Sequence, residues 1–368
     1  MGKQIERQKV KWIEEMLKID EYKAELQDYA QCNENLLRGF SGRSLFVSGA
    51  AGLIGSYLID LLAVASECCG LKLRICACDR NADLLSSRFA GMNGVVECLP
   101  IDVCVGVLPT GHFDYVIHAA SNTSPVDYAT KPIDTIWTNV FGAKRLLDFS
   151  VSCRAKRFLF CSSVEAYGRN NGDTDFFAEN YSGYVDCNTV RANYPASKRC
   201  VEALCNAYTA ENPGFEFVTA RIGRFYGPTV IAGDAKAPSQ FIGNAVRGED
   251  IVMKSDGTQL YSWGYVGDCA TALLTILQKG MAGEAYNVAD PASCAQLRDF
   301  AKYAAEAADV NVVFAKQSEV EQTGYSKITK ATLNVDKLCG LGWMAKYHLL
   351  EGIGRTVRYL RELKEDAR

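Results

Sequence analysis

SLFVSGAAGLIGSYLID, residues 44–60, joins a short β-prone run to three glycines and then to an apolar, helix-like segment. The order strand, glycine turn, helix is typical of a dinucleotide site. In such a site Gly49 allows the sharp turn, Gly52 lets a pyrophosphate approach the backbone, and Gly55 lets the helix pack closely on its strand. The unpaired N–H groups at the helix N-terminus then favour phosphate. An ordinary turn is the alternative, because glycines spaced GxxGxxG carry little information by themselves.

The bulk composition is that of a folded, soluble protein. Of the 368 residues 48% are apolar, and the net charge of -3 gives no electrostatic basis for binding nucleic acid or an anionic membrane. No apolar run is long enough for a transmembrane helix, and the N-terminus does not resemble a signal peptide. The 15 cysteines are scattered, and their spacing does not match a zinc site. We therefore expect reduced thiols, no metal and a cytoplasmic location.

Residues 1–41 are charged and helix-prone, and they predict a helical N-terminal arm. Its apolar residues recur at near-helical spacing, as one stripe: Trp12, Ile13, Met16, Leu17 and Ile19. We expect the arm to cover the main domain or a neighbouring subunit.

Strand-like and helix-like segments alternate after the glycine turn. The expected strands are 45–47, 73–78, 95–101, 115–118, 158–162 and 217–222, and the helices between them include 138–150 and 196–209. Repeated βαβ units with continuously apolar strands predict an α/β fold, a Rossmann-type, doubly wound parallel sheet covered on both faces. Ligands bind at the carboxyl ends of such strands. Further along the chain, Tyr265, Val266 and Asp268 are similar to a strand of a known family described below, in which the aspartate starts the following helix, and this resemblance implies that Asp268 caps a helix.

Two aspartates follow strands at positions where a dinucleotide binds. Asp79 ends the second strand, where a carboxylate accepts the ribose hydroxyls of NAD and repels the 2′-phosphate of NADP. Arg80 beside it weakens this preference for NAD. Asp102 ends the third strand and is placed to reach the adenine, or else it is a turn residue.

Tyr194 and Lys198 are the strongest chemical signal. In YPASK they lie four residues apart, on one face of a helix. A free phenol has a pKa of about 10, but an adjacent ammonium together with a cationic nicotinamide favours the phenolate. Tyr194 would then take a hydroxyl proton while hydride leaves the same carbon for NAD+. Upstream, Ser162 and Ser163 end the fifth strand, and Ser163 is the candidate to hydrogen-bond the reacting oxygen.

Together these motifs resemble the extended short-chain dehydrogenases/reductases, in the nucleotide-sugar epimerase/dehydratase family. The likeness runs from about residue 42 to the end of the sequence. It rests on GAAGLIGSYL (49–58), HAAS (118–121), TNVFGAKRLL (138–147), CSSVEAYG (161–168), YPASK (194–198) and RIGRFYGP (221–228).

The resemblance implies roles for single residues. It implies a catalytic triad of Ser163, Tyr194 and Lys198. It also implies an NAD site made by Gly49, Gly52, Leu53, Ile54, Gly55, Asp79, Asp102, Ala119, Ala120, Asn139, Ser162, Tyr194 and Lys198. Residues 42–228 would form the NAD-binding domain with the catalytic residues, and residues 229–368 mainly a lobe that holds the nucleotide-sugar. The family likeness further implies a homodimer.

One segment narrows the choice within the family. GYVDCNTVRANYPASKR (183–199) is similar to the stretch before the catalytic tyrosine of UDP-glucuronate decarboxylases. Glu165 falls where decarboxylases and 4,6-dehydratases both carry a functional glutamate. In a dehydratase this glutamate removes the proton beside the new ketone, so we expect Glu165 among the catalytic residues.

The chain departs from the family pattern at three positions. Val164 replaces the dehydratase aspartic acid, and valine cannot protonate a leaving hydroxyl, which disfavours 4,6-dehydration. Arg224 replaces an asparagine, and its guanidinium suggests an additional anionic group on the substrate or a different grip on the diphosphate. Tyr261 replaces an arginine that binds phosphate or a sugar carboxylate, which argues against decarboxylation unless Arg224 or Arg191 takes over. Arg191 is otherwise a structural ion-pair partner.

These observations predict an NAD-dependent enzyme that oxidises C4 of a nucleotide-linked sugar to a ketone. A uronic acid would then lose CO2, whereas a neutral hexose would be reduced on its other face. We expect a decarboxylase ahead of a 4-epimerase, and both ahead of a 4,6-dehydratase. A catalytically silent, NAD-responsive regulator on the same fold is the alternative from another class, although it has no need of Tyr194 and Lys198 together.

Overall fold

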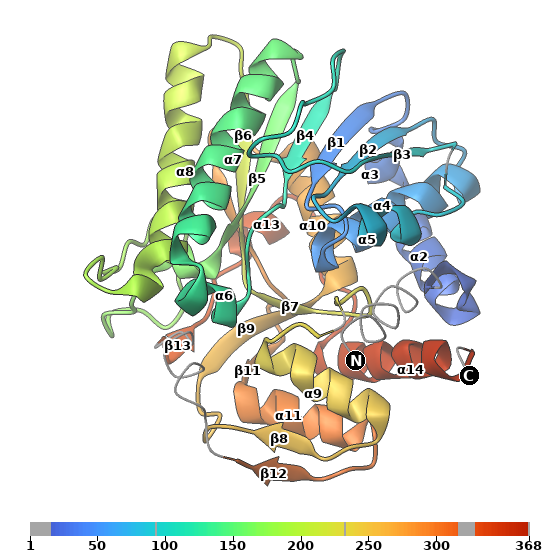
Figure 1. The fold of residues 1–368 in the computed structure, drawn as a ribbon, viewed down its shortest axis with the longest axis vertical. Helices are drawn as coiled ribbons and strands as arrows, with labels where there is room; N and C mark the ends of the chain where they lie inside the picture. Colours follow the sequence, from blue (N-terminus) through green and yellow to red (C-terminus); the bar gives the residue numbers. More distant parts are fainter. Residues whose placement is uncertain (1–15, 93, 232, 316–327, 367–368) are drawn as a thin grey trace.

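The structure is a computed structural model that describes residues 16–92, 94–231, 233–315 and 328–366. Its centre is a seven-stranded sheet with the order β10-β6-β5-β4-β1-β2-β3, in which all neighbouring strands are parallel (Figure 1). The strands are β1 (Ser44–Ser48), β2 (Arg74–Cys78), β3 (Val96–Leu99), β4 (Tyr115–His118), β5 (Arg157–Ser163), β6 (Phe217–Ile222) and β10 (Ala285–Val288). The predicted Rossmann-type sheet is confirmed. Strand order reverses between β1 and β4, and open sheets of this kind bind ligands at such a reversal.

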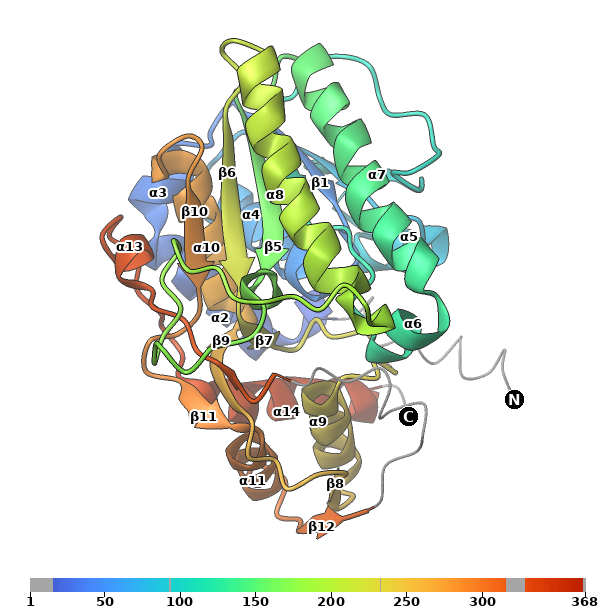
Figure 2. The ribbon, with the colours of Figure 1, turned by 90° about the vertical axis from the view of Figure 1, so that its left-hand side faces the viewer.

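Helices cover both faces of the sheet because side chains alternate along each strand. In β1, Leu45 and Val47 belong to the core shared with α4 (Leu53–Cys68) and α10 (Val266–Lys279), whereas Phe46 belongs to the core shared with α7 (Pro132–Ser152) and α8 (Asn193–Glu211). Figure 2 shows α7 and α8 side by side over one face of the sheet. The short helices α5 (Ala82–Arg88) and α6 (Pro125–Thr130) complete the crossovers after β2 and β4.

The N-terminal residues that the structure describes form η1 (Met16–Lys18), α2 (Asp20–Cys32) and α3 (Glu34–Arg38). Met16 and Ile19 are buried, whereas Trp12 and Ile13 of the expected stripe lie outside the described residues. Helix α2 packs on α4 of the same chain, and its buried Glu25 accepts hydrogen bonds from three phenols, those of Tyr57, Tyr265 and Tyr359. The arm therefore covers its own domain and joins it to the C-terminal helix.

A second lobe lies below the carboxyl ends of the strands (Figure 1). It contains β7 (Arg224–Tyr226), α9 (Ala237–Arg247), β8 (Ile251–Met253), β9 (Leu260–Tyr265), β11 (Cys294–Gln296), α11 (Leu297–Glu306), β12 (Val312–Phe314), β13 (Lys330–Ala331) and α14 (Leu349–Asp366). Strand β7 leaves the sheet directly after β6 and pairs with β9. The lobe is not continuous in sequence, because α10 and β10 return to the main sheet and the short α13 (Asp336–Cys339) packs beside β10. Residues 229–368 therefore contribute to the main sheet as well as to the second lobe.

Asp268 does not cap a helix as predicted. It is the third residue of α10, whose N-cap is Tyr265, and its carboxylate accepts the N–H groups of Lys346 and Tyr347 and the phenol of Tyr29. It therefore holds the segment before α14 and the arm against α10.

All 15 cysteines are free thiols in the structure, seven of them buried. Across the described ranges, no helix combines the length and apolar character needed to cross a bilayer.

Candidate active site

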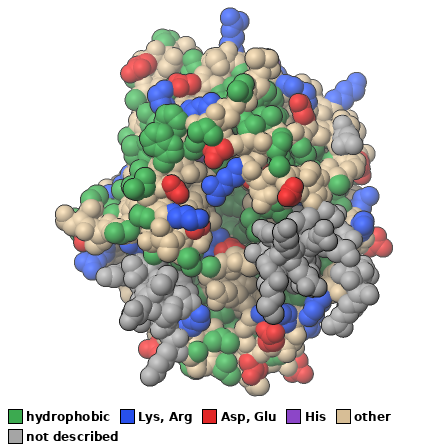
Figure 3. All heavy atoms as spheres, viewed as in Figure 1, with side chains coloured by type: hydrophobic (Ala, Val, Ile, Leu, Met, Phe, Trp, Pro, Cys, Tyr) green, Lys and Arg blue, Asp and Glu red, His purple; other side chains and the backbone are tan. Residues whose placement is uncertain are grey.

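A cavity of about 930 Å³ opens between the carboxyl ends of the strands and the second lobe. Figure 3 shows the surface hollowed at this place, with Lys and Arg side chains at its edge. The predicted site residues that line it are Gly49, Gly52, Leu53, Ile54, Gly55, Asp79, Asp102, Ala119, Ala120, Ser162, Ser163, Glu165, Arg191, Tyr194, Lys198, Arg224 and Tyr261. The structure thus brings together residues that lie as much as 212 positions apart, from Gly49 to Tyr261.

The glycine turn has a conformation that other residues adopt only with strain. Gly49 has a φ of +69°, and a Cβ atom on it would lie 2.6 Å from the amide nitrogen of Ala120. A Cβ atom on Gly55 would lie 2.3 Å from the carbonyl oxygen of Gly49. Gly52 is the N-cap of α4 and has no side chain to satisfy the N–H groups of its first turn, which border the cavity. This cradle fits the pyrophosphate of a dinucleotide.

Both predicted strand-end aspartates border the cavity and also hold backbone in place. Asp79 accepts the N–H groups of Ala51 in the glycine turn and of Asn81, and burial raises its pKa. Asp102 accepts the N–H group of Cys104 two residues on, which is the turn role expected as its alternative.

Asn139 differs from its expected place, because it is not among the residues that line the cavity. Its amide lies in the interior, where Oδ1 accepts from the Ser121 hydroxyl and Nδ2 donates to Ser197 Oγ at 2.8 Å. Since Ser197 lies in α8 and Asn139 in α7, the amide joins the two helices behind Tyr194. Thr138, the residue before it, lines the cavity instead.

Tyr194, Lys198 and Ser163 lie together at the carboxyl end of β5. Tyr194 and Lys198 occupy the first two turns of α8, and the Lys198 ammonium lies 5.6 Å from the centre of the Tyr194 ring. The ammonium donates to the carbonyl oxygen of Cys161 at 2.9 Å, so it points along β5 and away from bulk solvent. Ser163 Oγ accepts from the N–H of Glu165, and Ser162 donates to Glu202 at 2.6 Å.

The protein's own groups do not make the Tyr194 phenol acidic. Burial, and after it the charge of Glu165, raise its pKa to about 12, although the Ser163 hydroxyl and the nearby guanidinium groups act in the opposite direction. Burial lowers the pKa of Lys198 to about 8. The expected lowering of the Tyr194 pKa by Lys198 thus needs the additional positive charge of a bound nicotinamide.

Glu165 accepts from two arginines at once. Its Oε2 lies 2.6 Å from Nη2 of Arg191, and its Oε1 lies 3.2 Å from Nη2 of Arg224. Although burial acts against it, these charges hold the pKa of Glu165 below its usual value. Because a carboxylate with a lowered pKa is a weak base, the expected role of Glu165 in proton removal has little support in this geometry. Arg191 forms an ion pair with Glu165 and also lines the cavity, so the structure is compatible with both expected roles of this residue.

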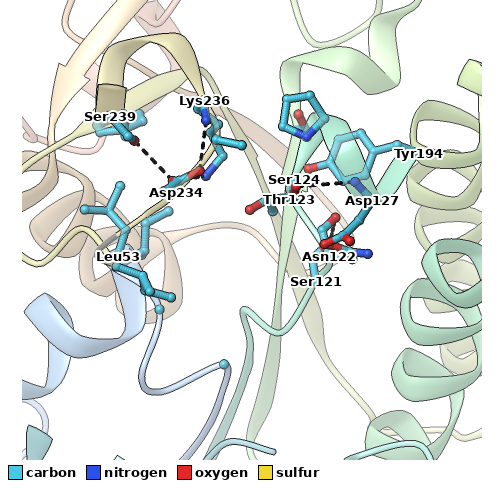
Figure 4. A pocket seen from close by; sticks show the side chains of 18 of the residues that line it. Leu53, Ser121, Asn122, Thr123, Ser124, Asp127, Tyr194, Asp234, Lys236 and Ser239 are labelled. Carbon is cyan, nitrogen blue, oxygen red and sulfur yellow. Dashed lines mark hydrogen bonds and ion pairs between the residues drawn. The ribbon is translucent and has the colours of Figure 1, made fainter. Parts of the chain in front are cut away.

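Two polar segments of the cavity wall had no role assigned from the sequence. One is the loop after β4, with Ser121, Asn122, Thr123 and Ser124, and the other leads into the first turn of α9, with Asp234, Lys236 and Ser239. Figure 4 shows them on opposite sides of the cavity, with Tyr194 on the side of the first loop. Asp234 accepts from Lys236 at 2.8 Å and from Ser239 at 3.1 Å. The sequence does contain a signal for the first loop, which is a run of polar residues directly after a strand.

Comparisons with known proteins agree with this architecture. Residues 45–289 match the NAD dependent epimerase/dehydratase family. The chain is 28% identical over 370 residues to UDP-glucuronic acid decarboxylase 1 of Xenopus tropicalis, covering 95% of this chain and 82% of the relative. It is 32% identical over 261 residues to UDP-glucuronic acid decarboxylase 5 of Arabidopsis thaliana, covering 68% and 71%. In fold it is similar to the epimerase Mth375 of Methanothermobacter thermautotrophicus, with a TM-score of 0.76 at 20% identity, over 90% of this chain and 96% of that one.

Proposed function

The chain belongs to the NAD-dependent epimerase/dehydratase family, and from that premise we propose that it converts a nucleotide-linked sugar through a 4-keto intermediate, as a decarboxylase of the UDP-glucuronate type. The observation that carries the proposal is the convergence of Ser163, Tyr194 and Lys198 in one cavity with the glycine turn. A regulator that only senses NAD has no use for this triad. The decarboxylase assignment is supported by the names of the related sequences.

Bound NAD+ would accept a hydride from C4 of the sugar and later return it. The residues that would hold it are the glycine turn, Asp79 and the loop after β4. Asp79 supports NAD over NADP, because a carboxylate at this place repels a 2′-phosphate.

Tyr194 would take the proton of the C4 hydroxyl as the hydride leaves, and would give it back on reduction. Ser163 would donate a hydrogen bond to the same oxygen, and the Lys198 ammonium would stabilise the phenolate. In a uronic acid the 4-ketone creates a β-keto acid. Its C5–C6 bond breaks, the electron pair moves into the enolate toward O4, CO2 leaves, and C5 takes up a proton.

4-Epimerisation is the second candidate, and Tyr261 is the observation that favours it. A phenol stands where the family usually has an arginine that binds phosphate or a sugar carboxylate. A neutral hexose, which has no carboxylate, would therefore lose fewer binding contacts at this position than a uronic acid. 4,6-Dehydration is disfavoured because the buried Val164 offers no proton for a leaving hydroxyl.

The test is a panel of UDP-, dTDP-, CDP- and GDP-sugars incubated with the purified protein, with products identified by mass and NMR and the nicotinamide absorbance band followed in parallel. Loss of the mass of CO2 identifies a decarboxylase, and an isomer of unchanged mass identifies an epimerase. Binding of NAD without any sugar-dependent change in the band would contradict the proposal and favour a regulator.

A homodimer through the first domain is supported by apolar side chains on α7. Ile133 and Trp137 are 78% and 53% exposed, and Trp137 stacks on Phe141 at 4.4 Å. Exposed side chains of this size on one helix are typical of an interface. Trp137→Lys should shift the protein toward the monomer in analytical ultracentrifugation, and a wild type that sediments as a monomer would contradict this.

The free thiols support the cytoplasm as the location we propose.

A further inference from the structure

A cluster of charge beside Tyr194 has more cations than anions. Glu165 forms ion pairs with both Arg191 and Arg224. The groups that raise the pKa of Arg224 are this one carboxylate and three phenols. The phenols of Tyr128, Tyr194 and Tyr261 stay neutral because burial raises their pKa values. Two guanidinium groups therefore share one carboxylate, and a net positive charge remains at a largely buried place.

The guanidinium groups, and not the carboxylate, face the cavity. The Glu165 side chain is 4% exposed, whereas those of Arg191 and Arg224 are 17% and 30% exposed. All three residues line the cavity wall. A ligand that enters thus meets arginine donors first, with the glutamate behind them.

Aromatic rings hold both guanidinium groups in place before any ligand binds. The Arg191 guanidinium lies 4.6 Å from the centre of the Tyr128 ring, and that of Arg224 lies 4.9 Å from the centre of the Tyr261 ring. The Nε atoms of both arginines are buried and have no acceptor among the described residues. The donors are thus fixed in direction and incompletely used, which is the state of a preformed anion site.

We propose that Arg191 and Arg224, held by Glu165, form a carboxylate subsite that selects a nucleotide-linked uronic acid over the neutral sugar. This inference rests on the proposed function and names its substrate class. Tyr261 then has a role at the position of the family's arginine, because its ring packs against the guanidinium of Arg224, which lies in β7. Glu165 is a positioning residue in this arrangement.

The position of the cluster favours the sugar carboxylate over the diphosphate. Tyr128, on which Arg191 stacks, is itself packed against Tyr194 with ring centres 4.9 Å apart. If Tyr194 acts on the C4 hydroxyl, an anion bound beside it belongs to a group close to C4. The C6 carboxylate is attached to the neighbouring carbon C5, whereas the diphosphate lies across the ring on C1.

The test measures dissociation constants by calorimetry for the full chain loaded with NADH, which cannot accept a hydride, so that the probes bind without reacting. The three probes are UDP-glucuronate, UDP-glucose and UDP. Wild type should bind UDP-glucuronate about tenfold or more tightly than UDP-glucose, the value of one charge-assisted hydrogen bond. Arg224→Gln should remove that preference and change binding of UDP and UDP-glucose by less than about twofold, since neither carries the carboxylate. Arg224→Lys should keep part of the preference, because lysine retains the positive charge but lacks the paired N–H donors of a planar guanidinium.

The matched control is Arg247→Gln, which removes an exposed arginine that pairs with Glu249 at 2.7 Å and does not line the cavity. It should leave all three constants unchanged. An equal loss of UDP binding in Arg224→Gln would assign the cluster to the diphosphate and overturn the inference. No carboxylate preference in the wild type would also overturn it, even if the protein oxidises a neutral sugar and the proposed function stands. If no nucleotide-sugar alters the nicotinamide band, the proposed function itself fails.

Discussion

Tyr194→Phe is the substitution that most directly tests the chemistry, because it removes a single oxygen atom. The ring contacts with Tyr128 at 4.9 Å and with the Lys198 ammonium at 5.6 Å do not involve that oxygen. The structural cost is then one buried hydrogen bond, that with Ser163, or about 1 kcal/mol. Since that is a small part of the usual stability of about 5–15 kcal/mol, the variant should fold and keep its NAD.

Turnover should fall far more than stability. Loss of a positioned general base costs about 10²–10⁴-fold, which corresponds to roughly 3–5 kcal/mol in the barrier. The assay is single-turnover stopped flow at the nicotinamide band with UDP-glucuronate. In the wild type the rate should rise with pH as the Tyr194 phenol loses its proton, because only the phenolate can accept the proton of the C4 hydroxyl. In Tyr194→Phe that rise should disappear.

Tyr128→Phe is the matched control, since it removes a hydroxyl from a neighbouring buried tyrosine that is not proposed to exchange protons. Its rate should fall by less than about tenfold and keep its dependence on pH. A Tyr194→Phe variant with normal NAD content and a rate within tenfold of the wild type would refute the assignment of Tyr194 as the base.

Three further substitutions test the scaffold. Gly55→Ala places a Cβ atom 2.3 Å from the carbonyl oxygen of Gly49, so NAD binding measured by calorimetry should weaken strongly, and unchanged affinity would show that the turn yields easily. Glu25→Ala leaves three buried phenols without their acceptor and should lower the free energy of unfolding in urea by about 3 kcal/mol or more, whereas Glu21→Ala, which removes an exposed ion pair, should cost less than about 1 kcal/mol. Burial raises the pKa of Asp268 to about 7, so the folded state holds its proton longer than the unfolded state, and stability should fall as the pH rises from about 4 to 7. Asp268→Asn should remove that part of the pH dependence, about 2 kcal/mol between pH 5 and pH 7, and an unaltered slope would contradict the shift.

Much of the architecture follows from local pattern. Strands β1, β2, β4, β5 and β6 lie within one residue of their expected bounds, because buried parallel strands are continuous apolar runs bounded by turn residues. The third strand ends two residues early, at Leu99, and it is an edge strand in which Glu97 and Cys98 are exposed, so it lacks the continuous burial of the central strands. The expected helices 138–150 and 196–209 lie inside α7 and α8 and were predicted too short, since helix ends depend on caps and packing.

The sequence by itself determined the glycine turn, the alternation of strand and helix, and the placing of Tyr194 and Lys198 on one helix face, because each depends on residues fewer than ten positions apart. Only the tertiary structure decided that Asn139 turns inward to Ser197, that β10 rejoins the main sheet, and that Glu165 is held by Arg191 and Arg224. The partners of Glu165 lie 26 and 59 positions away. No periodicity encodes such a pairing; it arises when the path of the backbone brings side chains into one buried place where every charge requires a partner.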